Sequence, residues 1–208
     1  MNDEQKQKLA SIKSRLGTGS INIFGLPMSG KDTVGVHLAE EIDARFLSSG
    51  IIIRAMEKAN GSNLSATGNL IPTNLFYSQV LPYFSMEELK PYPLILSSVG
   101  RWSGEENEIM RVAKESGHEI KAVVLLQISE KDVLERWEAS LLLHDRGDRA
   151  DDLDEQVFKK RIVEFNQKTV PVIQHYKDLG LLIEVPADCD RKEVFSNLVD
   201  ALYSSTLF

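Results

Sequence analysis

The sequence predicts an α/β protein in which a central parallel β-sheet has helices on both faces. Short apolar runs alternate along the chain with segments of helical period. The runs are apolar at consecutive positions, which is typical of parallel strands buried on both faces. The first run leads directly into a glycine-rich loop and then a helix. Strands that alternate with helices in this way favour a parallel sheet joined by crossover helices.

The first elements are a polar helix over 3–16, a strand over 21–24 and a helix near 31–44. Gly17-Thr18-Gly19 ends the first helix. Each helix has one apolar side, formed by Leu9, Ile12 and Leu16 in the first and by Val34, Leu38 and Ile42 in the second. The next stretch, 50–90, holds helical turns and polar loops but no convincing strand.

In the second half, strands are expected at 94–96, 122–126 and 181–185, and a helix at 105–115. Two further helices begin with capping boxes, in which a side chain at the first position bonds a backbone amide three residues later. These boxes are Ser129 with Asp132 and Asp190 with Glu193. The long helix near 153–178 contains Pro171, which removes a backbone donor and predicts a kink or a break.

Length and composition fit one globular domain. The chain has 208 residues, of which 42% are hydrophobic and 26% charged, enough to bury a core without disulfides or metal. Its single cysteine, Cys189, excludes a disulfide framework within the chain and a cysteine-cluster zinc site. No apolar run approaches the roughly 20 residues of a membrane span, and the first residues lack the apolar core of a secretory signal. We therefore expect a cytoplasmic monomer that binds no membrane.

The charge balance favours small-molecule partners. The net charge is −7, from 24 basic and 31 acidic residues. A broad nucleic-acid surface needs clustered lysine and arginine, so nucleic acid is not expected as a partner. A few arginines that converge in one cleft can still hold a small anion on an acidic protein.

The strongest motif is Gly25-Leu26-Pro27-Met28-Ser29-Gly30-Lys31, a G-x-x-x-x-G-K sequence between a strand and a helix. In such a P-loop, backbone amides turn inward around phosphates, and the following helix adds the positive end of its dipole. Lys31 supplies a full charge to the β- and γ-phosphates. The alternative is a strand–turn–helix corner with a chance lysine. The motif predicts an ATP site formed by Gly25, Met28, Ser29, Gly30, Lys31, Asp32 and Thr33.

Asp32 stands where this motif usually has the serine or threonine that contacts Mg²⁺. Position 32 therefore has no hydroxyl to ligate the ion, and no residue is expected to bind Mg²⁺ directly. We expect phosphates and water to hold Mg²⁺, with Asp32 as the candidate side chain beside it.

The loop resembles that of adenylate kinases and related nucleoside monophosphate kinases, which read G-x-P-G-x-G-K-x-T. Thr33 matches the threonine, whereas Met28 replaces the middle glycine. The resemblance covers roughly residues 20–205. Residues 46–54 resemble the I-S-T-G-D-x-L-R segment of the monophosphate site, 68–72 the G-x-L-V-P segment over the acceptor base, and 97–101 the D-G-F-P-R segment.

The C-terminal half continues the resemblance. Arg136 matches the arginine at the base of the lid, and Arg161 the arginine on the helix after the lid. Residues 149–152 resemble R-x-D-D, and 169–176 resemble T-x-P-L-I-x-x-Y. The family fold is a P-loop three-layer sandwich with a small helical insertion and, in this type, a short lid without zinc. The resemblance implies an N-terminal helical extension at 1–19 and a kinase domain at 20–208, with the core at 20–49, 91–142 and 153–208, the monophosphate-binding region at 50–90 and the lid at 143–152.

The resemblance also implies a function, transfer of the γ-phosphoryl group of ATP to a nucleoside monophosphate with Mg²⁺ as cofactor. The implied catalytic residues are Lys31, Arg101, Arg136, Arg149 and Arg161, and Arg136 also contacts ATP. The implied monophosphate site consists of Ser49, Gly50, Arg54, Gly68, Leu70, Ile71, Arg101 and Glu105. The implied lid residues are Arg149, Asp151 and Asp152, although the two aspartates also suit the first turn of a helix.

The chemistry of phosphoryl transfer supports a catalytic role for these arginines independently of the family resemblance. The transition state spreads negative charge over the transferred group, and planar guanidinium groups grip phosphate oxygens in pairs. Several arginines from separate segments that meet above one loop would supply the opposing charge. Each arginine alone also fits a surface salt bridge.

Three positions depart from the family pattern. Ser97 replaces the aspartate that orders magnesium-bound waters, and Asp32 is the hypothetical compensation, which the magnesium dependence of an Asp32→Asn variant tests. Ile51 replaces a polar residue and either alters acceptor docking or fills core.

The third departure is Glu105, which stands where the family reads the acceptor base with glutamine. A carboxylate only accepts hydrogen bonds, whereas N1 of adenine needs a donor and the edge of guanine offers two donors. The acceptor is then not AMP, unless Glu105 is a solvated residue in the first turn of a helix.

A second function class stays open, a nucleotide-binding regulatory protein that has kept the fold and lost turnover. Ser97 and Ile51 favour it, whereas Lys31 and the lid arginines oppose it. A small-metabolite kinase is disfavoured by the matches at Arg54 and 68–72, and a GTP switch by the absence of an N-K-x-D motif. Assays of the purified protein with ATP, Mg²⁺ and each monophosphate distinguish an enzyme from a regulator.

Overall fold

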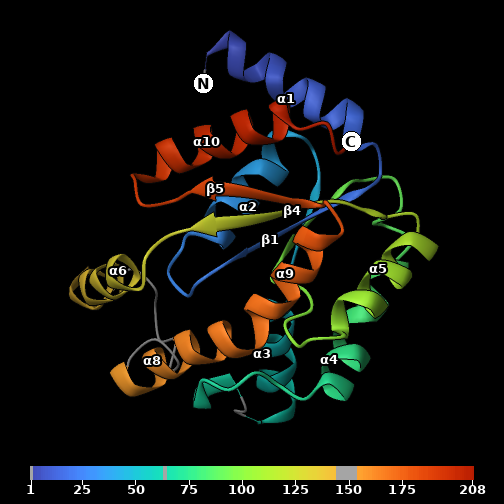
Figure 1. Ribbon diagram of the computed structural model, residues 1–208. Coiled ribbons are helices and arrows are strands. Elements are labelled where there is room, and N and C mark those ends of the chain that lie inside the picture. Colours follow the sequence, from blue (N-terminus) through green and yellow to red (C-terminus); the bar gives the residue numbers. More distant parts are fainter. Residues whose placement is uncertain (1, 63–64, 144–153) are drawn as a thin grey trace.

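The computed structural model describes residues 2–62, 65–143 and 154–208. Within these ranges the sheet has five parallel strands in the order β2-β3-β1-β4-β5 (Figure 1). The strands are β1 Ser20–Gly25, β2 Arg45–Ser48, β3 Leu94–Ser97, β4 Ile120–Gln127 and β5 Leu182–Pro186. The predicted parallel sheet is confirmed, and its central strand β1 is buried at every position.

Helices connect the strands in the alternating order that the sequence predicts. They are α1 Asp3–Leu16, α2 Lys31–Glu41, α3 Ser49–Asn60, α4 Thr73–Val80, α5 Glu105–Glu115, α6 Glu130–Leu143, α8 Glu155–Glu164, α9 Val170–Asp178 and α10 Arg191–Ser204. Shorter turns lie between them, namely η1 Ser65–Thr67, η2 Leu81–Ser85 and η3 Phe165–Thr169. Both predicted capping boxes form, since the Asp132 and Glu193 amides donate to the side chains of Ser129 and Asp190.

Helices cover both faces of the sheet, as predicted. Successive residues of a strand point to opposite faces, so Ile23 and Phe24 of β1 belong to different hydrophobic clusters. The cluster around Ile23 is completed by α1, α2 and α10, and the cluster around Phe24 by α3, α4, α5 and α9 (Figure 1). This arrangement leaves the carboxyl ends of the strands for a binding site.

The N-terminal extension is part of this fold. Leu9, Ile12 and Leu16 are buried, and α1 packs along α10. The Arg15 guanidinium donates hydrogen bonds to the Leu202 carbonyl at 3.0 Å and to other carbonyls at the end of α10. The extension therefore forms an outer layer on one face of the sheet.

Two boundaries differ from the sequence prediction. The helix predicted near 31–44 ends at Glu41, because Asp43 takes a left-handed conformation with φ 52° that a helix cannot continue. Ile42 is nevertheless buried, as its spacing predicts. Strand β2 was not predicted, because its four residues Arg-Phe-Leu-Ser include no β-branched side chain and run directly into α3.

The long helix changes its winding just before Pro171, where the sequence predicts a kink or a break. Helix α8 ends at Glu164, a wider π-type turn spans Phe165–Thr169, and α9 begins at Val170 with Pro171 in its first turn. The turn lets the chain continue although proline offers no amide and its ring would clash with the carbonyl four residues earlier.

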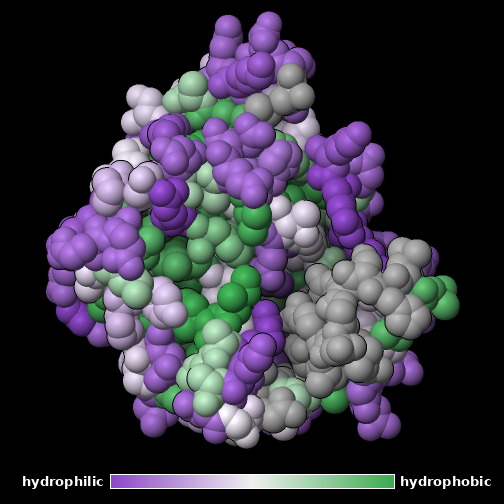
Figure 2. All heavy atoms as spheres, turned by 180° about the vertical axis from the view of Figure 1, so that it is seen from behind, coloured by the Kyte–Doolittle hydropathy of each residue, from purple (hydrophilic) through white to green (hydrophobic). Residues whose placement is uncertain are grey.

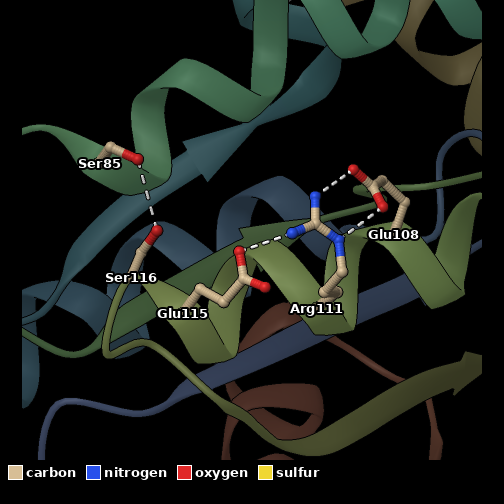
Figure 3. Close-up of polar contacts among 5 residues, drawn as sticks. All are labelled: Ser85, Glu108, Arg111, Glu115 and Ser116. Carbon is tan, nitrogen blue, oxygen red and sulfur yellow. Dashed lines mark hydrogen bonds and ion pairs between the residues drawn. The ribbon is translucent and has the colours of Figure 1, made fainter.

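Helix α5 has an exposed, charged outer side and a buried side at its first turn. On its outer side, Arg111 donates to Glu108 at 2.6 Å and to Glu115 at 2.6 Å, and Ser116 contacts Ser85 of η2 at 3.4 Å (Figure 3). These bonds raise the pKa of Arg111. The opposite side of its first turn is buried, with Glu105 2% and Glu106 3% exposed.

The molecular surface mixes residue types. Figure 2 shows a mostly hydrophilic face with a band of hydrophobic side chains across its middle. No helix in the described ranges has the length and apolar character to cross a membrane.

Candidate functional site

The loop after β1 turns twice through the left-handed region. Ser29 N donates to the Leu26 carbonyl at 3.1 Å, and φ is 66° at Met28 and 87° at Gly30. Helix α2 begins at Lys31, so its first amides face the loop. Gly25 must be glycine, since a Cβ there would lie 2.5 Å from Ser29 Oγ. The geometry is that of an anion-binding loop at a helix N-terminus.

Met28 occupies a position where the related motif has glycine. A left-handed φ costs a non-glycine residue about 1–2 kcal/mol, so the loop holds its shape against an intrinsic preference. The Met28 side chain packs at the edge of the cluster of Leu26, Val133, Trp137, Phe158 and Ile162. That packing offsets part of the backbone cost.

One cavity brings most of the predicted site residues together. Its walls come from the loop, the start of α3, the segment Gly68–Ile71, the β3–α5 connection and the α8–η3 junction. The predicted residues that line it are Gly25, Met28, Gly30, Lys31, Asp32, Thr33, Ser49, Gly50, Arg54, Gly68, Leu70, Ile71, Arg101, Glu105 and Arg161.

Cationic side chains from separate elements line this cavity. Lys31 begins α2, Arg54 belongs to α3, Arg101 follows β3, and Arg161 lies on α8. Burial, together with the charges of Arg161 and Arg54, lowers the pKa of Arg101 to about 10, against the opposing effect of Asp32 and Glu105. An arginine held beside two other guanidinium groups is stabilised by a bound anion.

Asp32 and Ser97 meet at the carboxyl end of the central strands. Ser97 is the last residue of β3 and is paired with Ile23 of β1. Its hydroxyl donates a hydrogen bond to Asp32 Oδ1. The carboxylate of Asp32 therefore lies beside the end of β3, next to the position at which the resemblance expects an aspartate.

Glu105 is a buried residue of the cavity wall, and the alternative that it is a solvated helix residue is wrong. Its Oε2 accepts hydrogen bonds from Arg101 N at 2.8 Å and Trp102 N at 3.1 Å. Its Oε1 is enclosed and has no hydrogen-bond partner among the described residues. Ile51, in contrast, is 50% exposed, so it does not fill core.

Contacts that the sequence did not reveal hold the segment Gly68–Ile71 over the cavity. Trp102 Nε1 donates to the Ile71 carbonyl at 3.1 Å, and Leu70 N donates to Glu164 Oε2 at 3.2 Å. Lys168 Nζ lies 2.5 Å from the same carboxylate and 4.0 Å from the centre of the Trp102 ring. The sequence offered one indication of this role of Trp102, namely its position directly after the predicted phosphate-site residue Arg101.

Some predicted residues lie elsewhere. The Arg136 guanidinium donates to the carbonyls of Ala187 at 2.7 Å, Cys189 at 3.0 Å and Met28 of the loop at 3.5 Å, and it is not among the residues that line the cavity. Ser29 is buried, and its Oγ has no partner among the described residues. The lid residues Arg149, Asp151 and Asp152, with most of the predicted lid 143–152, fall outside the described residues. Their roles stay predictions.

Comparisons with known proteins identify the family. No protein-family model matches the chain. An adenylate kinase of Bacteroides fragilis is 31% identical over 172 residues, which cover 77% of this chain and 86% of the relative. Adenylate kinases of Phocaeicola vulgatus and Synechococcus sp. are 28% and 29% identical and cover 88% and 86% of this chain, and 97% and 96% of their own lengths. Together with the parallel sheet and the phosphate loop, this similarity shows that the chain belongs to the adenylate kinase family.

Proposed function

We propose that this protein transfers the γ-phosphoryl group of ATP to a nucleoside monophosphate. The observation that carries the proposal is that the phosphate loop, Lys31 and three arginines line one cavity, the arginines being Arg54, Arg101 and Arg161. The relatives at 28–31% identity are adenylate kinases, which supports the same class of reaction. A cationic cavity can hold two phosphate groups close together against their mutual repulsion, and catalysis of phosphoryl transfer consists mostly of such positioning and electrostatic stabilisation.

Each residue has a role in this proposal. The loop amides and Lys31 hold the phosphates of ATP, while Arg54 and Arg101 hold the acceptor phosphate. Arg161 compensates the charge that develops between them. The acceptor phosphate is already an anion at neutral pH, so the reaction needs no general base. The segment Gly68–Ile71 closes the cavity, which excludes water and limits hydrolysis of ATP.

The residues present also fit a magnesium ion. Asp32 places a carboxylate at the cavity beside the loop, and carboxylate oxygens can hold Mg²⁺ through water. When bound, the ion neutralises phosphate charge. The Ser97 hydroxyl, which donates to Asp32, orients that carboxylate.

The test is a coupled assay with ATP, Mg²⁺ and each of AMP, GMP, CMP, UMP and dTMP. We expect one or more diphosphates to form. We expect Lys31→Met to lower kcat/KM on the order of a hundredfold, since it removes the cation that stabilises the negative charge of the transferred group. Lys131→Met is the matched control, because Lys131 is 82% exposed on α6 and pairs only with Glu135 among the described residues.

The regulatory alternative predicts a different result. Ser97 in place of an aspartate is its support. ATP binding by calorimetry, with no diphosphate formed from any of the five monophosphates, contradicts the kinase proposal and favours the regulator.

A further inference from the structure

The Glu105 carboxylate has one hydrogen-bonded oxygen and one buried oxygen without a partner among the described residues. Oε2 accepts from two backbone amides, those of Arg101 and Trp102. Oε1 is shielded from water and accepts nothing among the described residues. An enclosed carboxylate oxygen without a donor is costly, and native proteins rarely leave one without a reason. Because Glu105 lines the cavity, a ligand that displaces the groups now covering Oε1 can supply the missing donor.

The surroundings show which part of a ligand would reach Glu105. Arg101 is the neighbouring residue in the site, and its own amide fixes the carboxylate. A monophosphate held by Arg101 would thus have its sugar and base near the first turn of α5. Apolar and aromatic side chains, Phe76, Ile71 and Trp102, line the same cavity and suit a flat base.

The chemistry of the carboxylate selects among bases. Adenine places an acceptor, N1, beside its single exocyclic donor, so a carboxylate gains one hydrogen bond and faces a repelling lone pair. Guanine places N1–H beside the N2 amino group, so both adjacent groups donate toward one carboxylate oxygen. Uracil and thymine offer one N–H between two carbonyls, and cytosine pairs its amino group with an acceptor. Guanine is the common base that presents two adjacent donors.

We infer that the acceptor is a guanine nucleoside monophosphate and that Glu105 is the residue that selects it. The inference rests on the proposed function and names its acceptor. It also accounts for the departure at position 105, where the family resemblance expects glutamine. Glutamine and glutamate have the same shape, but the amide can donate to N1 of adenine and the carboxylate cannot.

The experiment measures binding and turnover separately. Calorimetry without ATP gives the affinities of GMP, IMP and AMP for the wild-type protein and for Glu105→Gln. IMP keeps N1–H but lacks the amino group. We expect affinities in the order GMP, IMP, AMP, with GMP about tenfold to a hundredfold tighter than AMP, because an unmatched buried acceptor costs that much. Glu105→Gln should lower or reverse the ratio.

A matched control is Glu115→Gln, a change of the same kind on the exposed end of α5, which should leave the ratio unaltered. Wild-type protein that binds AMP as tightly as GMP overturns the inference, and this comparison does not depend on the folding of any variant. A ratio that Glu105→Gln leaves unchanged overturns it as well. A GMP preference that Glu105→Gln abolishes, without any diphosphate formed in the presence of ATP and Mg²⁺, supports the role of Glu105 while contradicting the kinase proposal.

Discussion

The contact between Ser97 and Asp32 places a carboxylate close to where the family pattern has one, but on a different residue. In the family pattern the acidic group ends the strand, whereas here the strand ends in a hydroxyl that donates to an acidic group on α2. The negative charge therefore stays near the loop although its attachment point differs. This explains why the loss of the strand-end aspartate need not abolish a magnesium site.

Removal of that charge gives the first residue-scale prediction. Asp32→Asn should raise the Mg²⁺ concentration needed for half-maximal turnover about tenfold, because an outer-sphere partner of a metal typically contributes that much. Titration of Mn²⁺ followed by its paramagnetic signal, with ATP present, should show the same weakening without turnover. Asp43→Asn, at an exposed turn, is the control. Equal metal dependence in both variants means that Asp32 has no role at the ion.

Arg101 shows the tension between stability and binding. Its pKa lies below the ordinary arginine value, so folding disfavours its charged form. This cost is present at every pH below about 10 and disappears as the pH rises from about 10 to the ordinary value, since the folded state then no longer holds the proton.

We therefore expect Arg101→Met to stabilise the folded protein and to abolish its binding of the acceptor. The free energy of unfolding at neutral pH should rise by about 1 kcal/mol, as is common when a strained functional group is removed, while acceptor binding is lost. Thermal unfolding and calorimetry with a monophosphate measure the two effects. Arg111→Met removes an arginine that is already paired on the surface, and it should not stabilise. A lower melting temperature for Arg101→Met contradicts the electrostatic account.

At the element scale, the segment Gly68–Ile71 depends on a close approach to α8. Gly68 has φ 76°, and a Cβ there would lie 2.9 Å from the Val157 carbonyl. A side chain at this position thus meets both backbone strain and a clash. The segment closes over the cavity only because the position is glycine.

Gly68→Ala should consequently raise KM for the monophosphate about tenfold and change the affinity for ATP little, because it displaces the cover of the acceptor end alone. Gly61→Ala is a close control. Gly61 also has a positive φ, 69°, but a Cβ there would meet nothing within 4 Å. Steady-state kinetics of the two variants separate the clash from the strain, and similar KM values in both would show that the approach to α8 is unimportant.

At the scale of the whole molecule, local patterns predicted most elements of the fold. Strands with consecutive apolar residues and helices with capping boxes are confirmed, and the helix is irregular next to Pro171, because each feature depends on neighbours within a few residues. The edge strand β2 escaped prediction because four residues without a period carry little local signal. The strand order depends on pairings between distant segments, such as β1 with β3 and β4, which no short window contains.

The candidate site likewise has features that the sequence predicted and features that it did not. The phosphate loop was predictable from one contiguous motif, and the arginines from their match to a family pattern. The bonds of Trp102 to Ile71 and of Glu164 to Leu70 were not, since each joins segments that are distant in the sequence and meet only in the folded chain. The enclosed oxygen of Glu105 was invisible for the same reason.

The bond from the Trp102 indole to the Ile71 carbonyl has a practical consequence. The chain contains two tryptophans, and the other, Trp137, is stacked on Phe158 at a centroid distance of 5.3 Å. Movement of the segment over the acceptor end would break the indole bond and hydrate one ring while the stacked ring stays shielded. Ultraviolet emission of the unlabelled protein would then follow opening and closing in real time, with no dye attached.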